Sequence, residues 1–328
     1  MRTYVLVPLL FLASTSALEA QGSFSAGPST QNSECSIYPT QARNVCNAAV
    51  DGTRIFHPVA GLLVSGGNPV IGTAASLGGF PHFSITARVN AVQVSVPDLN
   101  YDGSSSTVPL DKKVVTPAPL VEAGLGLWKG LSGGLLAIDA LGSAQLLPTN
   151  QIDNLTVDPD ARKIGSIALG LGYGARVGIL KGSFPIPAVS VSVMKRTIPR
   201  IQYGDLSNPS QDYQYAIDLQ ATNLRLVAST RLLFLNFAAG LGWDKYVGDA
   251  TIAFREPLTG IPQPPINLKL DQTRTMVFAN TTLDFPVVKI AAEIGYQGGK
   301  DQNLTTDFQG FDEKKGHIFG GVGLRIGF

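Results

Sequence analysis

The chain has 328 residues and a formal net charge of +1. Only 15% of its residues are charged, against about a quarter in an average soluble protein, and this near-neutral balance argues against nucleic acid as the main partner. The length allows either two soluble domains or one large barrel.

The first predicted element is a secretory signal peptide over residues 1–20. An arginine precedes an apolar run over residues 4–12, and small residues follow. This is the three-part pattern of a signal peptide, and the run is too short for a membrane anchor, which needs roughly 20 residues. We expect export with cleavage after Ala17 or Ala20.

Residues 21–79 are predicted to form a separate N-terminal segment. The first part is polar, with a short helix expected at 41–50, and the rest is glycine-rich and only loosely periodic. The segment is either a periplasmic extension, a plug inside a barrel, or a source of two more strands. Cys35 and Cys46 are expected to form a disulfide in an oxidising compartment, the alternative being two free buried thiols. They have no CxxC spacing and no histidine cluster, so we expect no metal.

In the remainder, residues 80–328, apolar residues alternate with polar or small ones at the period of β-strands. In KIGSIALGLGYGARVGI, residues 163–179, one face is apolar and the other is mostly glycine and alanine, with one serine and one arginine. A soluble sandwich would place Lys, Glu and Thr on that second face. A face of small residues suits a crowded lumen, and the repeated apolar and polar faces are typical of an outer-membrane barrel.

Ten strands are predicted, connected alternately by long and short links. The expected ranges are 80–97, 117–129, 133–147, 162–180, 186–204, 211–230, 235–255, 266–282, 286–299 and 316–328. The alternation of the sixth strand slips near residues 221–223, which indicates a bulge or two shorter strands. The number of strands therefore lies between about eight and fourteen, because each alternating segment is a weak signal.

Charged residues on the inward phase are the main chemical feature. The predicted lumen-facing residues are Arg88, Glu122, Arg176, Arg196, Asp218, Lys289, Glu293 and Arg325. They form either a polar path or a set of internal ion pairs. We favour ion pairs, because side chains can largely fill the interior of a small barrel.

Catalysis is not indicated. The three histidines, at 57, 82 and 317, stand in no serine–histidine–acid pattern, and no paired carboxylates are recognisable. We therefore expect no enzyme, no catalytic residue, no cofactor and no metal.

The stretch DLNYDG, Asp98–Gly103, has the form of the first half of a calcium loop, but its twelfth position is Pro109 in place of a bidentate glutamate. We favour a loop tip in which the acidic residues form local turns. Addition of calcium should then leave the melting temperature unchanged in a thermal unfolding experiment, and a clear shift would contradict this interpretation.

The run GGFPHFSITARVNAVQVSVPDLN, the glycine-rich repeats and the final strand together resemble an uncharacterised family of bacterial outer-membrane β-barrels, over roughly residues 53–328. A more distant similarity is to the FadL-type transporters of long-chain fatty acids, which combine an N-terminal plug with a larger barrel. The resemblance implies an integral outer-membrane protein with no assigned cargo.

The sequence thus predicts an all-β transmembrane antiparallel barrel in the bacterial outer membrane, with an N-terminal extension or plug. The expected function is a passive channel or transporter for a small or hydrophobic solute. The alternative is a non-conducting structural or adhesive barrel that acts through its extracellular loops. Expected partners are outer-membrane lipid and the barrel assembly machinery; the solute is unknown.

The last strand ends on Phe328, in the lipid-facing phase at the periplasmic interface, where aromatic girdles occur. A terminal aromatic strand resembles the signal by which barrels are recognised for insertion. Deleting Phe328 should therefore lower the amount of barrel in the outer membrane, measured on membrane fractions, more than it alters solute specificity. Normal membrane levels of the truncated chain would contradict this.

Overall fold

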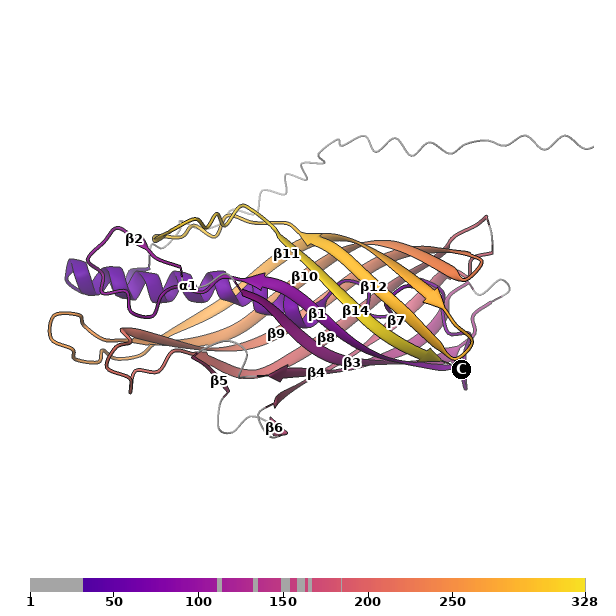
Figure 1. The fold of residues 1–328 in the computed structure, drawn as a ribbon, viewed down its shortest axis with the longest axis horizontal. Coiled ribbons are helices and arrows are strands. Elements are labelled where there is room, and N and C mark those ends of the chain that lie inside the picture. Colours follow the sequence, from indigo (N-terminus) through magenta and orange to yellow (C-terminus); the bar gives the residue numbers. More distant parts are fainter. Residues whose placement is uncertain are drawn as a thin grey trace, which may run out of the picture. The chain divides into compact units, whose positions relative to one another are not determined.

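The computed structural model describes residues 32–110, 114–131, 135–148, 154–157, 163–164, 167–183 and 185–327. Ten long strands lie in these ranges: β1 (Phe83–Val94), β3 (Val114–Trp128), β4 (Ala137–Pro148), β7 (Ile167–Leu180), β8 (Ala188–Tyr203), β9 (Tyr213–Leu232), β10 (Leu235–Phe254), β11 (Ile266–Asp284), β12 (Val288–Gln297) and β14 (His317–Gly327). Each pairs antiparallel with the next, and β14 pairs with β1 to close the barrel (Figure 1). The predicted ten-stranded barrel is confirmed.

The smaller elements lie in the connections and before the barrel. β5 (Leu155–Val157) pairs with β8, β6 (Lys163–Ile164) pairs with β7, and β2 (Thr107–Val108) pairs in parallel with β13 (Asp307–Phe308). Before β1 come a single 3-10 turn, η1 (Ser33–Cys35), and helix α1 (Thr40–Ser65). None of the helices in the described ranges is long and apolar enough to cross a membrane.

The two ends of the barrel differ in their connections. The links β3–β4, β7–β8, β9–β10 and β11–β12 are short and lie at one end, together with the start of β1 and the end of β14 (Figure 1). The five links at the other end are longer. Outer-membrane barrels have short periplasmic turns and longer extracellular loops, and by this pattern we assign the short-turn end to the periplasmic side and the loop end to the extracellular side.

An apolar belt faces outward in the half of the barrel nearer the short turns. On β10 the outward side chains of Phe237, Leu241 and Trp243 are 45%, 57% and 40% exposed, as expected of a lipid-facing band. Beyond Trp243 the same face of β10 carries Lys245 and Asp249. The strands therefore extend past the membrane boundary at the loop end.

The sixth strand, β9, differs from its prediction. Its odd-numbered residues are buried without interruption from Tyr213 to Ser229, and its register against β10 is constant. The prediction of Asp218 in the lumen is therefore wrong: this residue lies on the outer face, where it pairs with Arg200 at 3.3 Å. A register shift occurs instead in β8, between Ile198 and Ile201. The cause is that the extracellular half of the lumen holds an apolar helix while the outer face meets water, which reverses the usual polarity.

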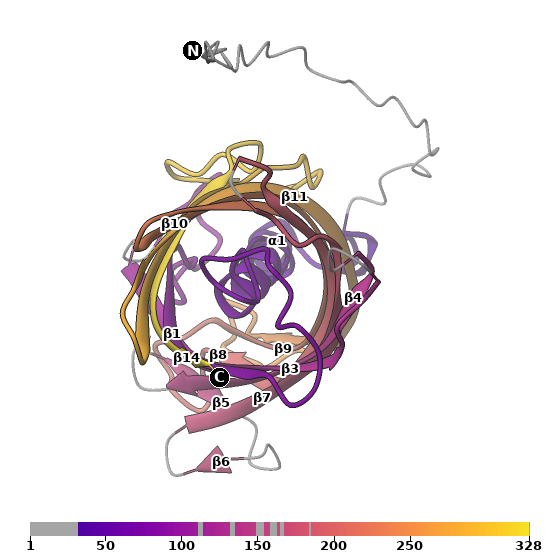
Figure 2. The same ribbon diagram turned by 90° about the vertical axis from the view of Figure 1, so that its right-hand side faces the viewer.

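That helix is α1, which lies within the ring of strands in the extracellular half (Figure 2). Phe56 is buried beside Tyr215, with ring centroids 6.0 Å apart. Gly61 allows close approach to the wall, because a methyl group there would overlap the ring of Tyr246. Each large apolar side chain buried along α1 stabilises this packing by about 1.5–3 kcal/mol relative to exposure.

The chain leaves α1 at Gly66 and continues inside the barrel towards the short-turn end, where Phe83 begins β1. The described part of the predicted N-terminal segment, residues 32–79, is thus a helix and an irregular coil in the lumen and among the loops. The position corresponds to the plug among the predicted alternatives. The proposed division into a signal peptide, an N-terminal segment and a barrel stays a prediction, and residues 1–20 and Phe328 lie outside the described residues.

Candidate functional site

The lumen is obstructed by the coil that follows α1. We call residues 63–77 the seal segment. Its backbone is held by inward-facing polar side chains of the barrel wall, most of which come from strands far apart in the sequence. Buried backbone groups need hydrogen-bond partners, and a coil has no ladder of its own to supply them. The wall supplies these partners.

Glu293 on β12 holds the first turn of the seal segment. Its two carboxylate oxygens accept hydrogen bonds from the backbone N–H groups of Gly67, at 2.9 Å, and Asn68, at 2.8 Å. The same carboxylate accepts from Asn280 Nδ2 at 2.7 Å and pairs with Arg88 at 2.8 Å. Hydrogen bonds to an ionised acceptor are about twice as strong as neutral ones, so Glu293 is a principal attachment point.

Arg88 on β1 links the seal segment to a chain of buried ion pairs. Its guanidinium donates to the Asn68 carbonyl at 2.8 Å and pairs with Glu122 at 3.3 Å as well as with Glu293. Glu122 in turn pairs with Arg196 at 3.0 Å. All four charged side chains are almost fully buried. The sequence-predicted residues 88, 122, 196 and 293 thus meet in one network.

Arg225 on β9 is a second attachment point that sequence reasoning missed. It donates to the carbonyls of Gly66, at 2.9 Å, and Gly67, at 2.8 Å, just after the C-terminus of α1, and pairs with Asp244 at 2.6 Å. A cation there also complements the negative end of the helix dipole. Had every odd-numbered residue of β9 been taken as inward-facing, Arg225 would have been identified.

The remaining predicted lumen charges lie closer to the short-turn end. Arg176 pairs with Asp139 at 2.8 Å, and Asp139 accepts from the Leu77 backbone N–H at 3.2 Å. Arg325 donates to the Ile71 carbonyl at 2.8 Å. Lys289 lies 3.6 Å from Asp284. Asp139 and Asp284 were not predicted, because single acidic residues in short apolar stretches gave no pattern.

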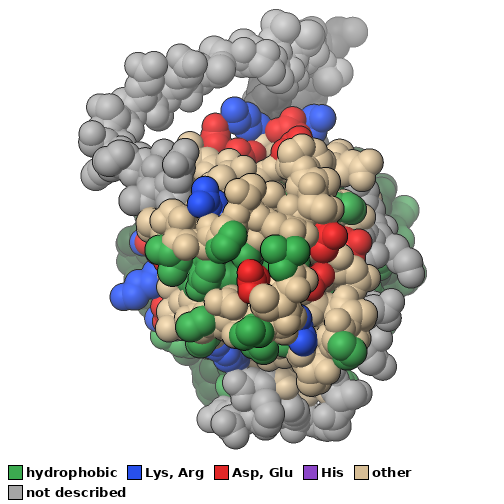
Figure 3. All heavy atoms as spheres, turned by 90° about the vertical axis from the view of Figure 1, so that its left-hand side faces the viewer, with side chains coloured by type: hydrophobic (Ala, Val, Ile, Leu, Met, Phe, Trp, Pro, Cys, Tyr) green, Lys and Arg blue, Asp and Glu red, His purple; other side chains and the backbone are tan. Residues whose placement is uncertain are grey.

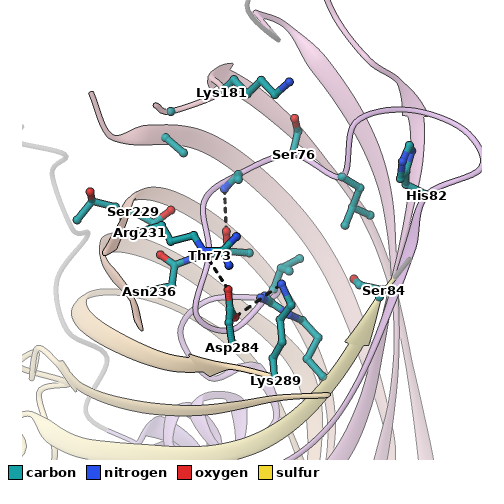
Figure 4. A pocket seen from close by; sticks show the side chains of 18 of the residues that line it. Thr73, Ser76, His82, Ser84, Lys181, Ser229, Arg231, Asn236, Asp284 and Lys289 are labelled. Atoms are coloured by element: carbon teal, nitrogen blue, oxygen red, sulfur yellow. Dashed lines mark hydrogen bonds and ion pairs between the residues drawn. The ribbon is translucent and has the colours of Figure 1, made fainter. Parts of the chain in front are cut away.

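On the short-turn side of the seal segment lies a cavity of about 590 Å³, which we call the vestibule (Figure 4). The seal segment forms its roof through residues such as Thr73 and Ser76, and its floor opens between short turns that contribute Lys181 and Leu233. Figure 4 shows Asp284 between Arg231 and Lys289 on one side of this space. The vestibule therefore has charged side chains among its lining and opens at the short-turn end of the barrel.

On the other side of the seal segment, at the loop end of the barrel, the long loops fold over the start of α1. Asp51 on the helix accepts hydrogen bonds from the backbone N–H groups of Thr305 and Thr306, both at 2.8 Å, and Asn44 donates to the Gly103 carbonyl at 3.0 Å. In Figure 3 the part of the loop end not covered by grey atoms is a closed surface of mixed polar, apolar and acidic groups. We call the described extracellular loops and the start of α1, from residue 32 to Asp51, the cap; with the seal segment, it obstructs the lumen in the described part of the chain.

Cys35 and Cys46 form a disulfide within the cap, with their Cα atoms 5.6 Å apart. Both residues are fully buried. Replacing both cysteines with serine should lower the stability of the cap by about 3 kcal/mol, the value of the chain-entropy model for a loop of this size. Limited proteolysis on intact cells should then cut the cap faster while the strands stay protected. Equal cutting rates for the two proteins would contradict this.

An apolar crevice runs between α1 and the wall in the extracellular half. It is lined by Phe56, Ala60, Leu63, Val64, Val94, Thr116, Pro117, Leu147, Leu155, Ile198 and Ile201, and its volume is about 40 Å³. At this level β7 and β8 separate: they pair only as far as Leu171 with Thr197, and residues 201–203 of β8 pair with β5 instead. The crevice therefore lies where the ladder between two neighbouring strands is interrupted.

Other residues that the sequence singled out make local structural contacts. In the stretch DLNYDG, Asp98 accepts from the Asn100 backbone N–H and Asp102 from that of Ser104, so both carboxylates form local turns. His82 contacts the Gly79 carbonyl at 2.9 Å near the short turns. No group of three or more His, Cys, Asp or Glu side chains in the described part of the chain is arranged to hold a metal.

Comparison with known proteins finds weak similarities to solved structures. No family model and no curated protein matches this chain. Among solved structures, the translocator domain of the autotransporter NalP from Neisseria meningitidis is 11% identical with a TM-score of 0.39, covering 88% of this chain and 98% of its own. The toluene transporter TodX from Pseudomonas putida is 11% identical with a TM-score of 0.28, covering 75% and 88%. The N-terminal barrel domain of OprF from Pseudomonas aeruginosa is 13% identical with a TM-score of 0.26, covering 48% and 87%.

TM-scores this low assign no activity to the chain. Its own features define the class: a closed ten-stranded barrel, an apolar belt, short turns at one end and long loops at the other. The chain is an outer-membrane β-barrel protein.

Proposed function

We propose that this barrel is a gated transporter for a small hydrophobic solute. The observation that carries the proposal is the apolar crevice beside α1, placed where β7 and β8 part. Binding sites for small molecules are concave and mostly apolar, with volumes of roughly 300–1,000 Å³, so this crevice of about 40 Å³ must widen to admit a solute. A crevice in the wall at the outer boundary of the belt is a suitable place for an apolar molecule to leave the membrane or the medium.

The proposed path runs from the crevice, past the seal segment, into the vestibule. Leu63 lines the crevice and is also the first residue of the seal segment, while Val70 and Thr73 line the vestibule. The two spaces thus lie on opposite sides of one short coil. Passage requires the seal segment to move, and its attachments include the hydrogen bonds of Glu293, Arg88 and Arg225.

Uptake of a hydrophobic fluorescent probe into proteoliposomes tests this proposal. Ala60→Trp and Leu155→Trp, each of which places a large ring in the crevice, should slow uptake towards the rate of protein-free vesicles. Ala216→Trp, on the outer face of β9, is the matched control and should leave uptake unchanged. Wild-type vesicles that take up the probe no faster than protein-free vesicles would overturn the proposal.

A second candidate is a non-conducting barrel that makes contacts through its loops. The folded cap favours it, because Asp51 and the β2–β13 ladder give the loops a defined shape. An intact barrel without probe uptake would support this candidate over transport.

A further inference from the structure

The vestibule carries an excess of positive charge. Among the described residues that line it, four carry a cationic side chain, Lys181, Arg231, Lys289 and Arg325, and one carries a carboxylate, Asp284. Asp284 is shared between Arg231 and Lys289, each at 3.6 Å. Even with both of these loose pairs counted, the lining attracts anions.

Arg325 is the most deeply buried of these four cations. Its side chain is buried, with the residue only 5% exposed, and one guanidinium nitrogen donates to the Ile71 carbonyl. Among the described residues, no carboxylate lies within ion-pair distance of it. The nearest compensating charge is that of Asp284, which lies beyond ion-pair distance and is already shared by Arg231 and Lys289. A buried charge with so little compensation is costly, because the lost hydration is not replaced. An anion in the vestibule would replace it.

Neutral hydrogen-bonding groups complete the surroundings. Ser76, Ser84 and Ser229 also line the vestibule, and Figure 4 shows their hydroxyl groups around the same space as Lys289. Hydroxyl groups donate hydrogen bonds readily to an anionic oxygen, and a guanidinium fits a carboxylate or phosphate with two parallel N–H groups. The volume of about 590 Å³ is sufficient for a small organic anion.

We propose that the vestibule is a binding site for an oxyanion, a phosphate or carboxylate group, that enters from the periplasmic side with Arg325 as its buried partner. Lys289 and Arg231 hold the more exposed side of the anion. The site is separate from the hydrophobic crevice, so it does not depend on the transport proposed above.

Binding of inorganic phosphate to the full-length barrel in a zwitterionic detergent tests the site, because this measurement needs no solute movement. Titration calorimetry at constant ionic strength, with chloride as the competing salt, should detect phosphate binding. Arg325→Gln should weaken it by about tenfold or more, as expected for loss of a bidentate charged group. Lys245→Gln, on the outer face of β10, is the matched control and should bind as the wild type does.

Arg325 is buried, and its replacement could impair folding. The double variant Arg231→Gln with Lys289→Gln alters more exposed cations, and it too should bind phosphate less tightly than the wild type. A parallel titration with anionic phospholipid in micelles separates the two sources of the group: competition between lipid and phosphate would identify a lipid headgroup as a ligand, and its absence would leave a free anion. Phosphate binding no stronger than that of chloride, or unchanged in both sets of variants, would overturn the proposal.

Discussion

Replacing Arg88 with methionine should destabilise the folded barrel by about 3–5 kcal/mol, the usual cost of removing one partner from a buried ion pair. Arg88 pairs with both Glu122 and Glu293 and holds the Asn68 carbonyl. Its loss leaves two buried carboxylates with fewer partners. Methionine keeps much of the side-chain volume, so the effect measures lost polar contacts more than a cavity.

The measurement is urea unfolding in detergent micelles, and the matched control is Lys245→Met. Lys245 pairs with Asp271 at 3.2 Å on the outer face, where both side chains are well exposed. Such a pair contributes at most about 1 kcal/mol. Similar losses for the two variants would contradict the central place of the Arg88 network.

The second large effect concerns the side of the membrane on which the chain begins its path through the lumen. A protease-cleavable epitope placed immediately before Asn32 should be cut completely on intact cells. The reason is that α1 starts among the extracellular loops, with Asn44 bonded to Gly103 and Asp51 to Thr305. The same epitope in the β9–β10 turn, after Leu233, should resist the protease until the outer membrane is permeabilised.

The reverse pattern, with the turn accessible and the N-terminal epitope protected, would show that the short-turn end faces outward. Protection of both epitopes on intact cells, followed by cleavage of both after permeabilisation, would place the start of α1 on the periplasmic side. Either result would contradict the orientation derived from turn lengths.

Most of the barrel was predictable from alternation, because a lipid-facing band must be apolar on every strand. This rule failed for β9 beyond the belt. There Tyr213, Tyr215 and Ile217 face a helix inside the lumen, while Asp218 faces water. Sequence alternation defines two faces, but which face is inside depends on what fills the lumen.

The site was predictable only in part. The alternation placed Arg88, Glu122, Arg196 and Glu293 on inward phases, and all four meet in the ion-pair network. Their shared task, holding the backbone of the seal segment, was not foreseeable, since the segment is glycine-rich and has no strand or helix period. Contacts such as that between Glu293 and Gly67 span more than 200 residues of sequence.

The most direct test of a lumen closed by its own N-terminal coil is single-channel recording in planar bilayers. Wild-type barrels should be silent, and Glu293→Ala should show discrete openings, because it frees the backbone N–H groups of Gly67 and Asn68. Asp271→Ala on the outer face should remain silent. A steady open conductance of the wild type, equal to that of Glu293→Ala, would contradict a sealed lumen.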